Sequence, residues 1–376
     1  MKKGDRNIFL LGGSSLLNDI GSEMITPILP FLIISFGGAG LAVGLISGLR
    51  EGMSSLVKLF GGWLSDKTGK RKSFVLFGYL ISIIFRFLLA LASSWHSIIT
   101  LVSLERFGKI RDAPRDAIIA DTTKKRGRGF GIHQMMDTSG GILGALIVLL
   151  LFWKFHWSFS SIIITAAAIS VFSIIPLFLL KNTDKKPQKI KLFKGIRELS
   201  PKLKYLIFVL AVFTLGNFGL YLFILLIVKN ITGSFIIPLL FYLLFNIISA
   251  AFTVFFGKLS DKIGRKKVLM SGFILFLIVS LAFTFNATSL TAIAIIFAFY
   301  GLVYAITLSN QKAFVSDLAN NNKGTAIGFY YFVVGIVNII AGLIAGLLWD
   351  ISPEIMFTYI SVIALMAVIL LAFVKE

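Results

Sequence analysis

The sequence predicts an all-α polytopic membrane protein with twelve transmembrane helices in two pseudo-symmetric six-helix bundles. Three observations predict this class. First, 57% of the 376 residues are hydrophobic and 14% are charged, a composition that is foreign to soluble domains. Second, long apolar runs alternate with short polar loops. Third, one basic loop occurs twice, about half a chain apart, which indicates a duplicated bundle.

The apolar runs approach or exceed the roughly 20 residues that a helix needs to cross a bilayer. The expected spans lie near residues 7–36, 41–65, 74–93, 97–121, 129–153, 158–180, 205–229, 234–258, 268–287, 289–312, 325–348 and 352–374. The first run is interpreted as a span and not as a signal peptide, because no small-residue cleavage site follows it and it continues through Pro30. The expected domains are an N-terminal bundle (1–180), a basic cytoplasmic linker (181–204) with a short interfacial helix, and a C-terminal bundle (205–376).

Lysines and arginines are sorted between the two sides of the predicted bundles. The tails, the linker and the loops of one side hold nearly all basic residues outside the spans, whereas the opposite side carries Lys154 and Lys229. This asymmetry places both termini in the cytoplasm of a multi-pass protein of the cell membrane. It attributes the net charge of +20 to topology and anionic lipid headgroups, and not to nucleic-acid binding.

The repeated loop runs from Gly62 to Lys72 and again from Gly257 to Lys267, with seven of eleven positions identical. Its glycines suit a close helix contact and a tight reversal, and its basic residues fit a cytoplasmic loop. A second pair of loops follows the fourth and tenth spans at nearly the same offset. The residues expected to form a cytoplasmic gate are Gly62, Asp66, Gly69, Arg71, Asp121, Gly257, Asp261, Gly264, Arg265 and Asp317.

An aspartate at the C-terminal end of a span is disfavoured by the helix dipole, so we expect each loop aspartate to have a partner. For Asp66 the expected partner is Arg71 or a helix end near Thr325, and for Asp261 a weaker contact is expected near Arg128.

The repeated pattern resembles the signature loop between helices 2 and 3 of the major facilitator superfamily, with its echo between helices 8 and 9. The resemblance covers essentially the whole chain and implies two six-helix halves around a central solute site. It also implies that the first, fourth, seventh and tenth helices line the cavity. Arg106 matches the arginine of a motif that the superfamily often carries on its fourth helix. On the fifth, Gly140 and Gly144 match an antiporter pattern whose proline is replaced by Ala145, and we expect them to form a close helix contact.

Charged side chains fall inside the spans of the first half. Asp19 and Glu23 lie one turn apart, so their carboxylates are expected within ~6 Å of each other. By default such residues face an interior cavity, with a structural salt bridge to the second span as the alternative. Two carboxylates that close do not both ionise easily, so one can hold a proton. The candidate proton-coupling residues are Asp19, Glu23, Glu51 and Asp137, and the expected charge partners are Arg50, Lys58 and Arg106.

The spans of the second half carry polar and aromatic stripes in place of charges. Each stripe repeats every three or four residues, which ordinary helix packing explains one at a time. Together the stripes indicate a shared wet surface for an organic, partly apolar solute. The residues expected to line this substrate cavity are Asn217, Tyr221, Tyr300, Tyr304 and Gln311.

The resulting hypothesis is a secondary active transporter that moves a small organic solute by alternating access. The expected mode is proton-coupled efflux. The alternative is uptake or exchange of an anionic metabolite bound by the arginines of the N-terminal bundle. A receptor or lipid-moving protein on the same scaffold is a third class, and an enzyme is disfavoured because no nucleophile–base pair emerges. The expected partners are a small-molecule substrate, protons and the lipid bilayer; the protein is expected to be a monomer without cofactor, metal or nucleic acid.

Overall fold

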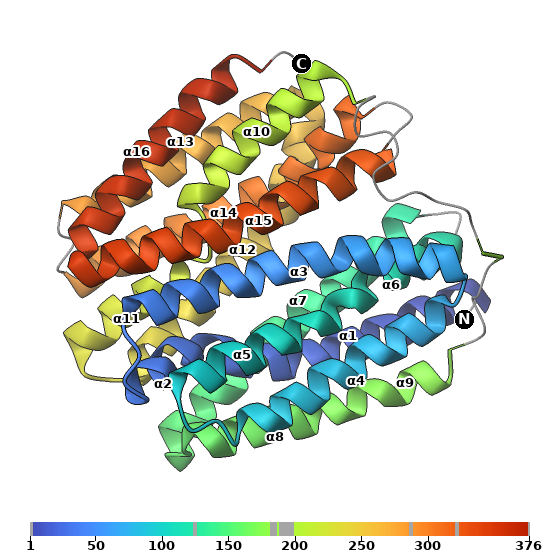
Figure 1. The fold of residues 1–376 in the computed structure, drawn as a ribbon, viewed down its shortest axis with the longest axis horizontal. Coiled ribbons are helices and arrows are strands. Elements are labelled where there is room, and N and C mark those ends of the chain that lie inside the picture. The colour runs from blue at the N-terminus through green and yellow to red at the C-terminus, as the bar shows by residue number, and fades with distance from the viewer. Residues whose placement is uncertain are drawn as a thin grey trace. The chain divides into compact units, whose positions relative to one another are not determined.

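The computed structural model describes residues 3–122, 126–180, 186–187, 199–285, 289–319 and 323–374. Within these ranges every regular element is a helix, as the composition predicts (Figure 1). Most of the linker over residues 181–204, including the expected interfacial helix, lies outside the described residues. The described chain forms two compact units.

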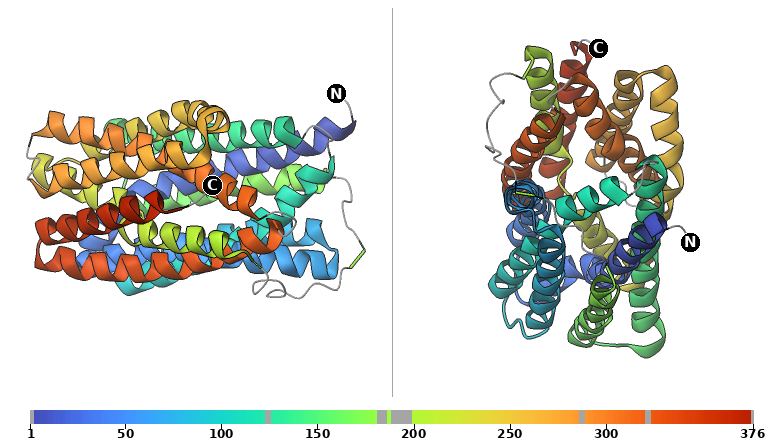
Figure 2. Two further views of the ribbon diagram at one scale, coloured as in Figure 1. Left: turned by 90° about the horizontal axis from the view of Figure 1, so that it is seen from above. Right: turned by 90° about the vertical axis from the view of Figure 1, so that its right-hand side faces the viewer.

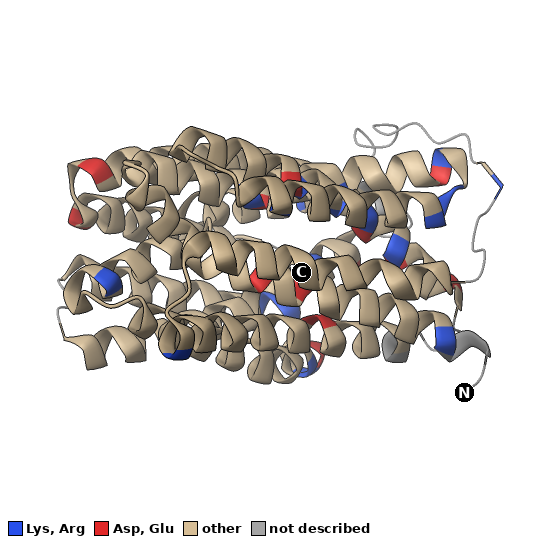
Figure 3. Ribbon diagram, turned by 90° about the horizontal axis from the view of Figure 1, so that it is seen from below, with Lys and Arg blue, Asp and Glu red and all other residues tan. Residues whose placement is uncertain are grey.

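Ten of the described helical stretches are long and apolar enough to cross a membrane. Two further predicted spans carry many charges: α3 (Gly40–Thr68), and the stretch from α5 (Trp95–Arg106) through η2 (Phe107–Arg111) to α6 (Asp112–Thr122). Most of the ribbon bears no charged residue, so these charges stand out (Figure 3). A span with charges along its length has to face protein or water and not lipid, which makes both of these spans interior.

The first compact unit comprises residues 1–37 and 53–191. In it, α1 packs mainly on α7 and on α8. A Cβ at Gly140 or Gly144 of α7 would lie 2.5 or 2.4 Å from a carbonyl oxygen of α1, so the predicted glycine contact is confirmed. Besides the second half of α3 and the elements α5, η2 and α6, the unit contains α1 (Lys3–Ile25), η1 (Thr26–Ile28), α2 (Leu29–Ser35), α4 (Arg71–Leu89), α7 (Arg126–Phe155), α8 (Phe159–Val171), η3 (Phe172–Ile174) and α9 (Ile175–Phe178).

The second unit comprises residues 38–52 and 192–376, so it includes the first half of α3. There α3 packs glycine against glycine on α15: a Cβ at Gly44 would lie 2.2 Å from the carbonyl oxygen of Gly342. Figure 2 shows the long helices from two further directions. The other helices of this unit are α10 (Pro201–Gly216), α11 (Tyr221–Thr232), α12 (Ile236–Ile263), α13 (Arg265–Thr284), α14 (Leu290–Leu318), α15 (Lys323–Ile351) and α16 (Pro353–Ala372).

Four of the predicted spans are interrupted; the sixth contains the short 3-10 turn η3 between α8 and α9. The first changes to a 3-10 turn at η1, which contains Pro27, a residue without a backbone N–H to donate. The fourth tightens at η2, where Gly108 lies against α4. The seventh, for which the sequence analysis expected no break, stops at Gly216 and resumes at Tyr221. Gly219 in this gap has a φ of +66°, a conformation that favours glycine and that does not continue a helix.

Serine side chains define several helix starts. Ser94, Ser158, Ser200 and Ser352 each accept a hydrogen bond from the backbone N–H three residues further on. Proline follows two of these serines as the first residue of α10 and α16, where its missing N–H costs nothing. These caps fix where the apolar runs begin as helices.

Candidate functional site

A buried arginine–glutamate network connects four helices of the N-terminal unit. Arg86 on α4 is 2% exposed, and its Nη2 donates to Glu105 Oε1 at 2.9 Å. Its Nη1 donates to Asn18 Oδ1 at 3.0 Å and to Ser170 Oγ at 2.6 Å. The Nε of Arg106 lies 3.0 Å from the other oxygen of Glu105. The network therefore links α1, α4, α5 and α8, and Arg86 acts as an interior anchor.

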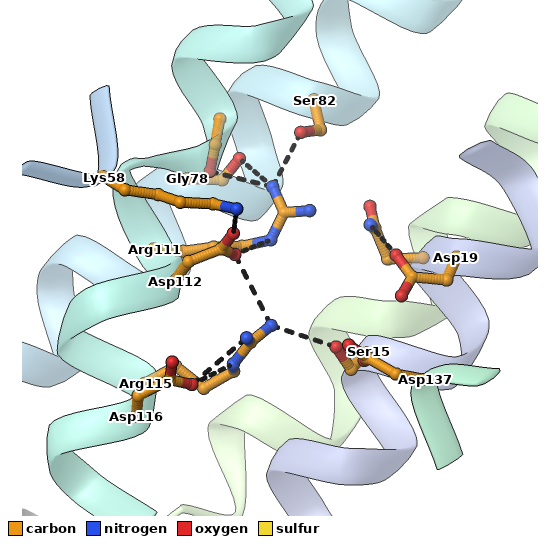
Figure 4. Close-up of polar contacts among 12 residues, drawn as sticks. Ser15, Asp19, Lys58, Gly78, Ser82, Arg111, Asp112, Arg115, Asp116 and Asp137 are labelled. Carbon is orange, nitrogen blue, oxygen red and sulfur yellow. Dashed lines mark hydrogen bonds and ion pairs between the residues drawn. The ribbon is translucent and has the colours of Figure 1, made fainter. Parts of the chain in front are cut away.

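Asp112, at the start of α6, is surrounded by three cations (Figure 4). Lys58 Nζ lies 3.3 Å from its Oδ2, while Arg115 Nη1 and Arg111 Nε lie 3.4 and 3.9 Å from its Oδ1. The guanidinium of Arg111 also stacks on the ring of Tyr79, 4.4 Å from the centroid. Three cations around one buried carboxylate make this cluster a structural element that holds α3, α4 and α6 together.

Asp19 and Asp137 are held differently from the other acidic side chains of this unit. Asp19 accepts a hydrogen bond from Asn18 Nδ2 at 3.2 Å. Asp137 Oδ1 is buried without a hydrogen-bond partner, and it lies 3.9 Å from Nε2 of His133. Among the residues that the structure describes, no lysine or arginine lies within ion-pair distance of either carboxylate.

The two carboxylates act on each other from α1 and α7. Asp19 lies on α1 and Asp137 on α7, and these helices pack closely against each other at Gly140 and Gly144. Figure 4 shows Asp19 and Asp137 across from the Asp112 cluster, with Asp137 beside Ser15, the serine to which Arg115 donates. The arrangement can therefore bind one proton between two acids while nearby cations modulate its affinity.

The cations expected to pair with Asp19 and Glu23 have other positions or other described partners. Lys58 forms its described ion pair with Asp112, and Arg106 forms its pair with Glu105. Glu23 is half-buried and packs against α7, where Cβ atoms placed at Gly141 and Gly144 would lie 3.6 and 3.1 Å from it. Arg50 is buried in the first half of α3 and belongs to the second compact unit.

The first signature loop closes an ion cluster at the C-terminal end of α3. Arg71 Nη2 lies 3.1 Å from Asp66 Oδ1, and Arg71 Nη1 lies 2.6 Å from Asp121 Oδ2 at the end of α6. The predicted pairing of Asp66 with Arg71 is present. The side chain of Thr325, the other expected partner, lies outside the described residues.

The second signature loop repeats this arrangement in the C-terminal unit. Arg265 pairs with Asp261, and its Nε lies 3.0 Å from Asp317 Oδ2. The guanidinium also contacts the Ser260 hydroxyl. The side chain of Arg128, expected near Asp261, lies outside the described residues.

The four motif glycines have different roles. Gly69 and Gly264 have φ values of +75° and +101°, which confirms the predicted reversal. A Cβ at Gly62 would lie 3.1 Å from Ala113, so this glycine permits a close approach of α3 to α6. A Cβ at Gly257 would meet no atom within 4 Å, so the close contact expected there is absent.

The expected cavity residues of the C-terminal unit lie around the break in the seventh span. Tyr300 is fully buried, and its hydroxyl donates to Asn217 Oδ1 at 2.8 Å. The ring of Tyr304 lies 5.3 Å from that of Tyr300, and both pack on Phe245. The structure thus brings together side chains from α12, α14 and the break.

Tyr221 and Gln311, the other expected cavity residues, also make contacts within the C-terminal unit. Tyr221, the first residue of α11, stacks near Phe245 at 5.9 Å. Gln311 on α14 accepts a hydrogen bond at 2.8 Å from the hydroxyl of Tyr330, on α15. Glu51 lies in the same unit and acts electrostatically on the hydroxyls of Tyr300 and Tyr304.

Sequence reasoning missed the contacts that anchor the first half of α3. Ser47 Oγ donates to the carbonyl oxygens of Phe218 and Gly219, in the break, at 2.9 and 3.0 Å. The carboxylate of Asp350 accepts the backbone N–H groups of Gly40 and Leu41 at 2.6 and 2.8 Å, capping the start of α3. The sequence signal for a close helix contact here was the glycine at every fourth position of α3, at residues 40, 44, 48 and 52. No group of three acidic or histidine side chains that could hold a metal ion occurs in the described part of the chain.

Comparisons with known proteins agree with this architecture. The family model described as Major Facilitator Superfamily matches residues 11–249 and 206–376. The chain is 46% identical to an uncharacterized MFS-type transporter of Methanocaldococcus jannaschii, over 98% of this chain and 95% of the relative. It is 28% identical to the multidrug resistance protein MdtH of Proteus mirabilis, over 45% of this chain and 44% of that protein. The crystal structure of a mutant of the nucleoside transporter NupG has a TM-score of 0.82 at 14% identity, covering 98% of this chain and 100% of that chain.

Proposed function

The chain belongs to the major facilitator superfamily, and on that basis we propose that it couples the movement of protons to the efflux of a small organic solute by alternating access. As a multi-pass membrane transporter it has to draw energy from a gradient, because the sequence contains no nucleotide-binding loop of the Gly-x-x-x-x-Gly-Lys-Ser/Thr type. The similarity of about half the chain to a multidrug resistance protein supports the direction and the solute class.

The observation that carries the coupling proposal is the state of Asp19 and Asp137. In a unit where Glu105 and Asp112 are paired with several cations, these two acids have no lysine or arginine at ion-pair distance among the described residues. Asp137 additionally leaves one buried oxygen without a hydrogen bond. A proton shared between the two carboxylates would relieve their repulsion and supply a donor for that oxygen.

The same geometry supplies a route to coupling. Arg115 Nη1 donates to Ser15 Oγ at 3.1 Å, one turn before Asp19 on α1. A motion of α6 relative to α1 would change the distance between this cation and the carboxylate, and with it the affinity for a proton. A proton site whose affinity differs between two conformations is what transport against a gradient requires.

The buried arginines disfavour uptake of an anionic metabolite. The guanidinium of Arg86 binds Glu105, and that of Arg111 donates to backbone and hydroxyl oxygens. The guanidinium of Arg115 pairs with Asp112 and Asp116. An anion would have to displace these contacts. We therefore assign these arginines to holding the helices and not to binding solute.

We assign the cytoplasmic gate to the two signature-loop clusters. Each cluster joins one arginine to two aspartates. Arg71 pairs with Asp66 and Asp121, and Arg265 pairs with Asp261 and Asp317. Asp66→Ala removes one acid from the first cluster and should favour the inward-open state. The accessibility of cysteines introduced into the cytoplasmic half of the cavity measures this shift, and unchanged labelling would contradict the assignment.

Proteoliposomes test the coupling proposal. A solute is first identified by a thermal-shift screen, since ligands stabilise the protein that binds them. Asp19→Asn and Asp137→Asn should then abolish transport driven by a pH gradient, while solute counterflow survives because it needs no net proton movement. Glu354→Gln is the control, since that acid is fully exposed at the start of α16. Retention of pH-driven transport at wild-type rates in both variants would show that these residues are not the proton site.

A further inference from the structure

The break in the seventh span creates a region of negative potential inside the C-terminal unit. α10 ends at Gly216, and the C-terminal end of a helix carries a partial negative charge. The carbonyl oxygens of Phe218 and Gly219 are outside any helix; both accept the Ser47 hydroxyl, and that of Gly219 also accepts the backbone N–H of Leu222. Broken transmembrane helices of this kind present carbonyl oxygens to cations.

Glu51 supplies a carboxyl group near this place. It follows Ser47 by one turn, so the two side chains share a face of α3, and Ser47 touches the break. Glu51 is half-buried in the same unit and lies within electrostatic range of the hydroxyls of Tyr300 and Tyr304. The neighbouring Arg50 leaves the helix about 100° away from Glu51.

Aromatic rings surround the same point. Phe245 lies 5.6 Å from Tyr300 and 5.0 Å from Tyr304 between ring centroids, and 5.9 Å from Tyr221. Tyr300 is buried, whereas Tyr304 and Glu51 are half-buried and leave an accessible edge. Aromatic faces attract cations through their quadrupole and at the same time accept apolar groups.

From this juxtaposition we propose that Glu51, the Tyr304 ring and the broken seventh span form the binding site of an organic cation with an apolar body. The inference rests on the proposed transport function and names its substrate class. It removes Glu51 from the proton-coupling residues: the carboxylate neutralises the positive charge of the solute, the rings hold its apolar part, and the carbonyl oxygens of the break face its charge. Proton coupling then remains with Asp19 and Asp137 in the other unit.

Equilibrium binding of tetraphenylphosphonium to the purified full-length protein tests the proposal. This probe carries a delocalised positive charge inside four phenyl rings, and tetraphenylborate is its anionic counterpart of the same shape. Tetraphenylphosphonium should bind and tetraphenylborate should not compete. Glu51→Gln should weaken binding at least tenfold, and Glu51→Asp should restore part of the affinity because the charge is kept. Tyr304→Ala should weaken binding, whereas Tyr304→Phe should retain it.

Glu354→Gln is the matched control, because this acid of the same unit is fully exposed at the start of α16. It should bind the probe like the wild type, and monodisperse elution in size-exclusion chromatography verifies the fold of each variant. No binding, equal binding of the anion, or equal affinity in Glu51→Gln would each overturn the cation site. Such a failure would leave the pH-driven transport of another solute and its dependence on Asp137 intact, so the two proposals fail separately.

Discussion

Replacing Glu105 by glutamine removes the counter-charge of two buried arginines. Oε1 and Oε2 of Glu105 lie 2.9 and 3.0 Å from Arg86 and Arg106, and the three side chains are 9%, 2% and 8% exposed. Glutamine has the same shape and keeps one acceptor oxygen, so the variant changes charge more than packing. Because Arg86 also holds Asn18, the neighbour of Asp19, the perturbation bears on the position of the proposed proton site.

Neutralising one partner of a buried ion pair costs about 3–5 kcal/mol, because the other charge stays buried without compensation. Arg86 keeps its hydrogen bonds to Asn18 and Ser170, so we expect the lower end of that range, about 3 kcal/mol. Asp317→Asn is the control: its carboxylate lies 3.0 Å from Arg265, with side chains 53% and 23% exposed. Such an exposed pair contributes about 0–1 kcal/mol.

The free energy of unfolding can be measured by titrating each purified variant with sodium dodecyl sulfate in lipid–detergent micelles and following tryptophan fluorescence. Glu105→Gln should lose at least about 2 kcal/mol more than Asp317→Asn. Adding Arg86→Met to Glu105→Gln removes one uncompensated cation and should recover part of the loss. Equal losses in Glu105→Gln and Asp317→Asn would refute the reasoning that the network is buried and poorly screened.

Three other expectations follow from single contacts. Gly44→Ala should destabilise the protein by about 1–3 kcal/mol, because the added Cβ would lie 2.2 Å from a carbonyl oxygen of α15. Gly13→Ala is the control: its Cβ would lie 4.0 Å from the nearest atom, so this variant should be neutral or stabilising in the same assay. Asp350→Ala removes the cap of α3 and should cost about 1 kcal/mol, while Asp350→Asn should lose less; equal stability of the alanine variant and the wild type would contradict the cap. Cysteines introduced at Gly4 and Lys375 of this cysteine-free chain should resist an impermeant thiol reagent in intact cells, and ready labelling of either would reverse the predicted orientation.

Local chemistry explains what could be predicted from the sequence. Apolar length predicts a spanning helix wherever it occurs, so most spans were placed within a few residues of their observed ends. Glycine acts on its own backbone, which is why the reversals at Gly69 and Gly264 were predictable. The ion pair of Asp66 with Arg71 was predictable because the two residues belong to one short loop.

Pairing across helices was the limit of the sequence analysis. Helical period shows that Asp19 and Lys58 face inward, but it does not show which neighbour each one meets. The structure pairs Lys58 with Asp112 and packs α1, which carries Asp19, on α7, which carries Asp137. Those choices depend on how closely helices approach, and the glycines at 140 and 144 set the distance between α1 and α7.

The sequence by itself thus determined the class of protein, the approximate number and the order of its hydrophobic segments, and the repeat of its signature loop, because these depend on composition and local spacing. Only the tertiary structure decided that the seventh span breaks beside Ser47 and that the first half of α3 groups with the C-terminal helices. The physical reason is that helix packing in a membrane depends on close contact between small residues and on hydrogen bonds between distant segments. Ser47 and Gly219, 172 positions apart, form such a contact, and no periodicity in either segment encodes it.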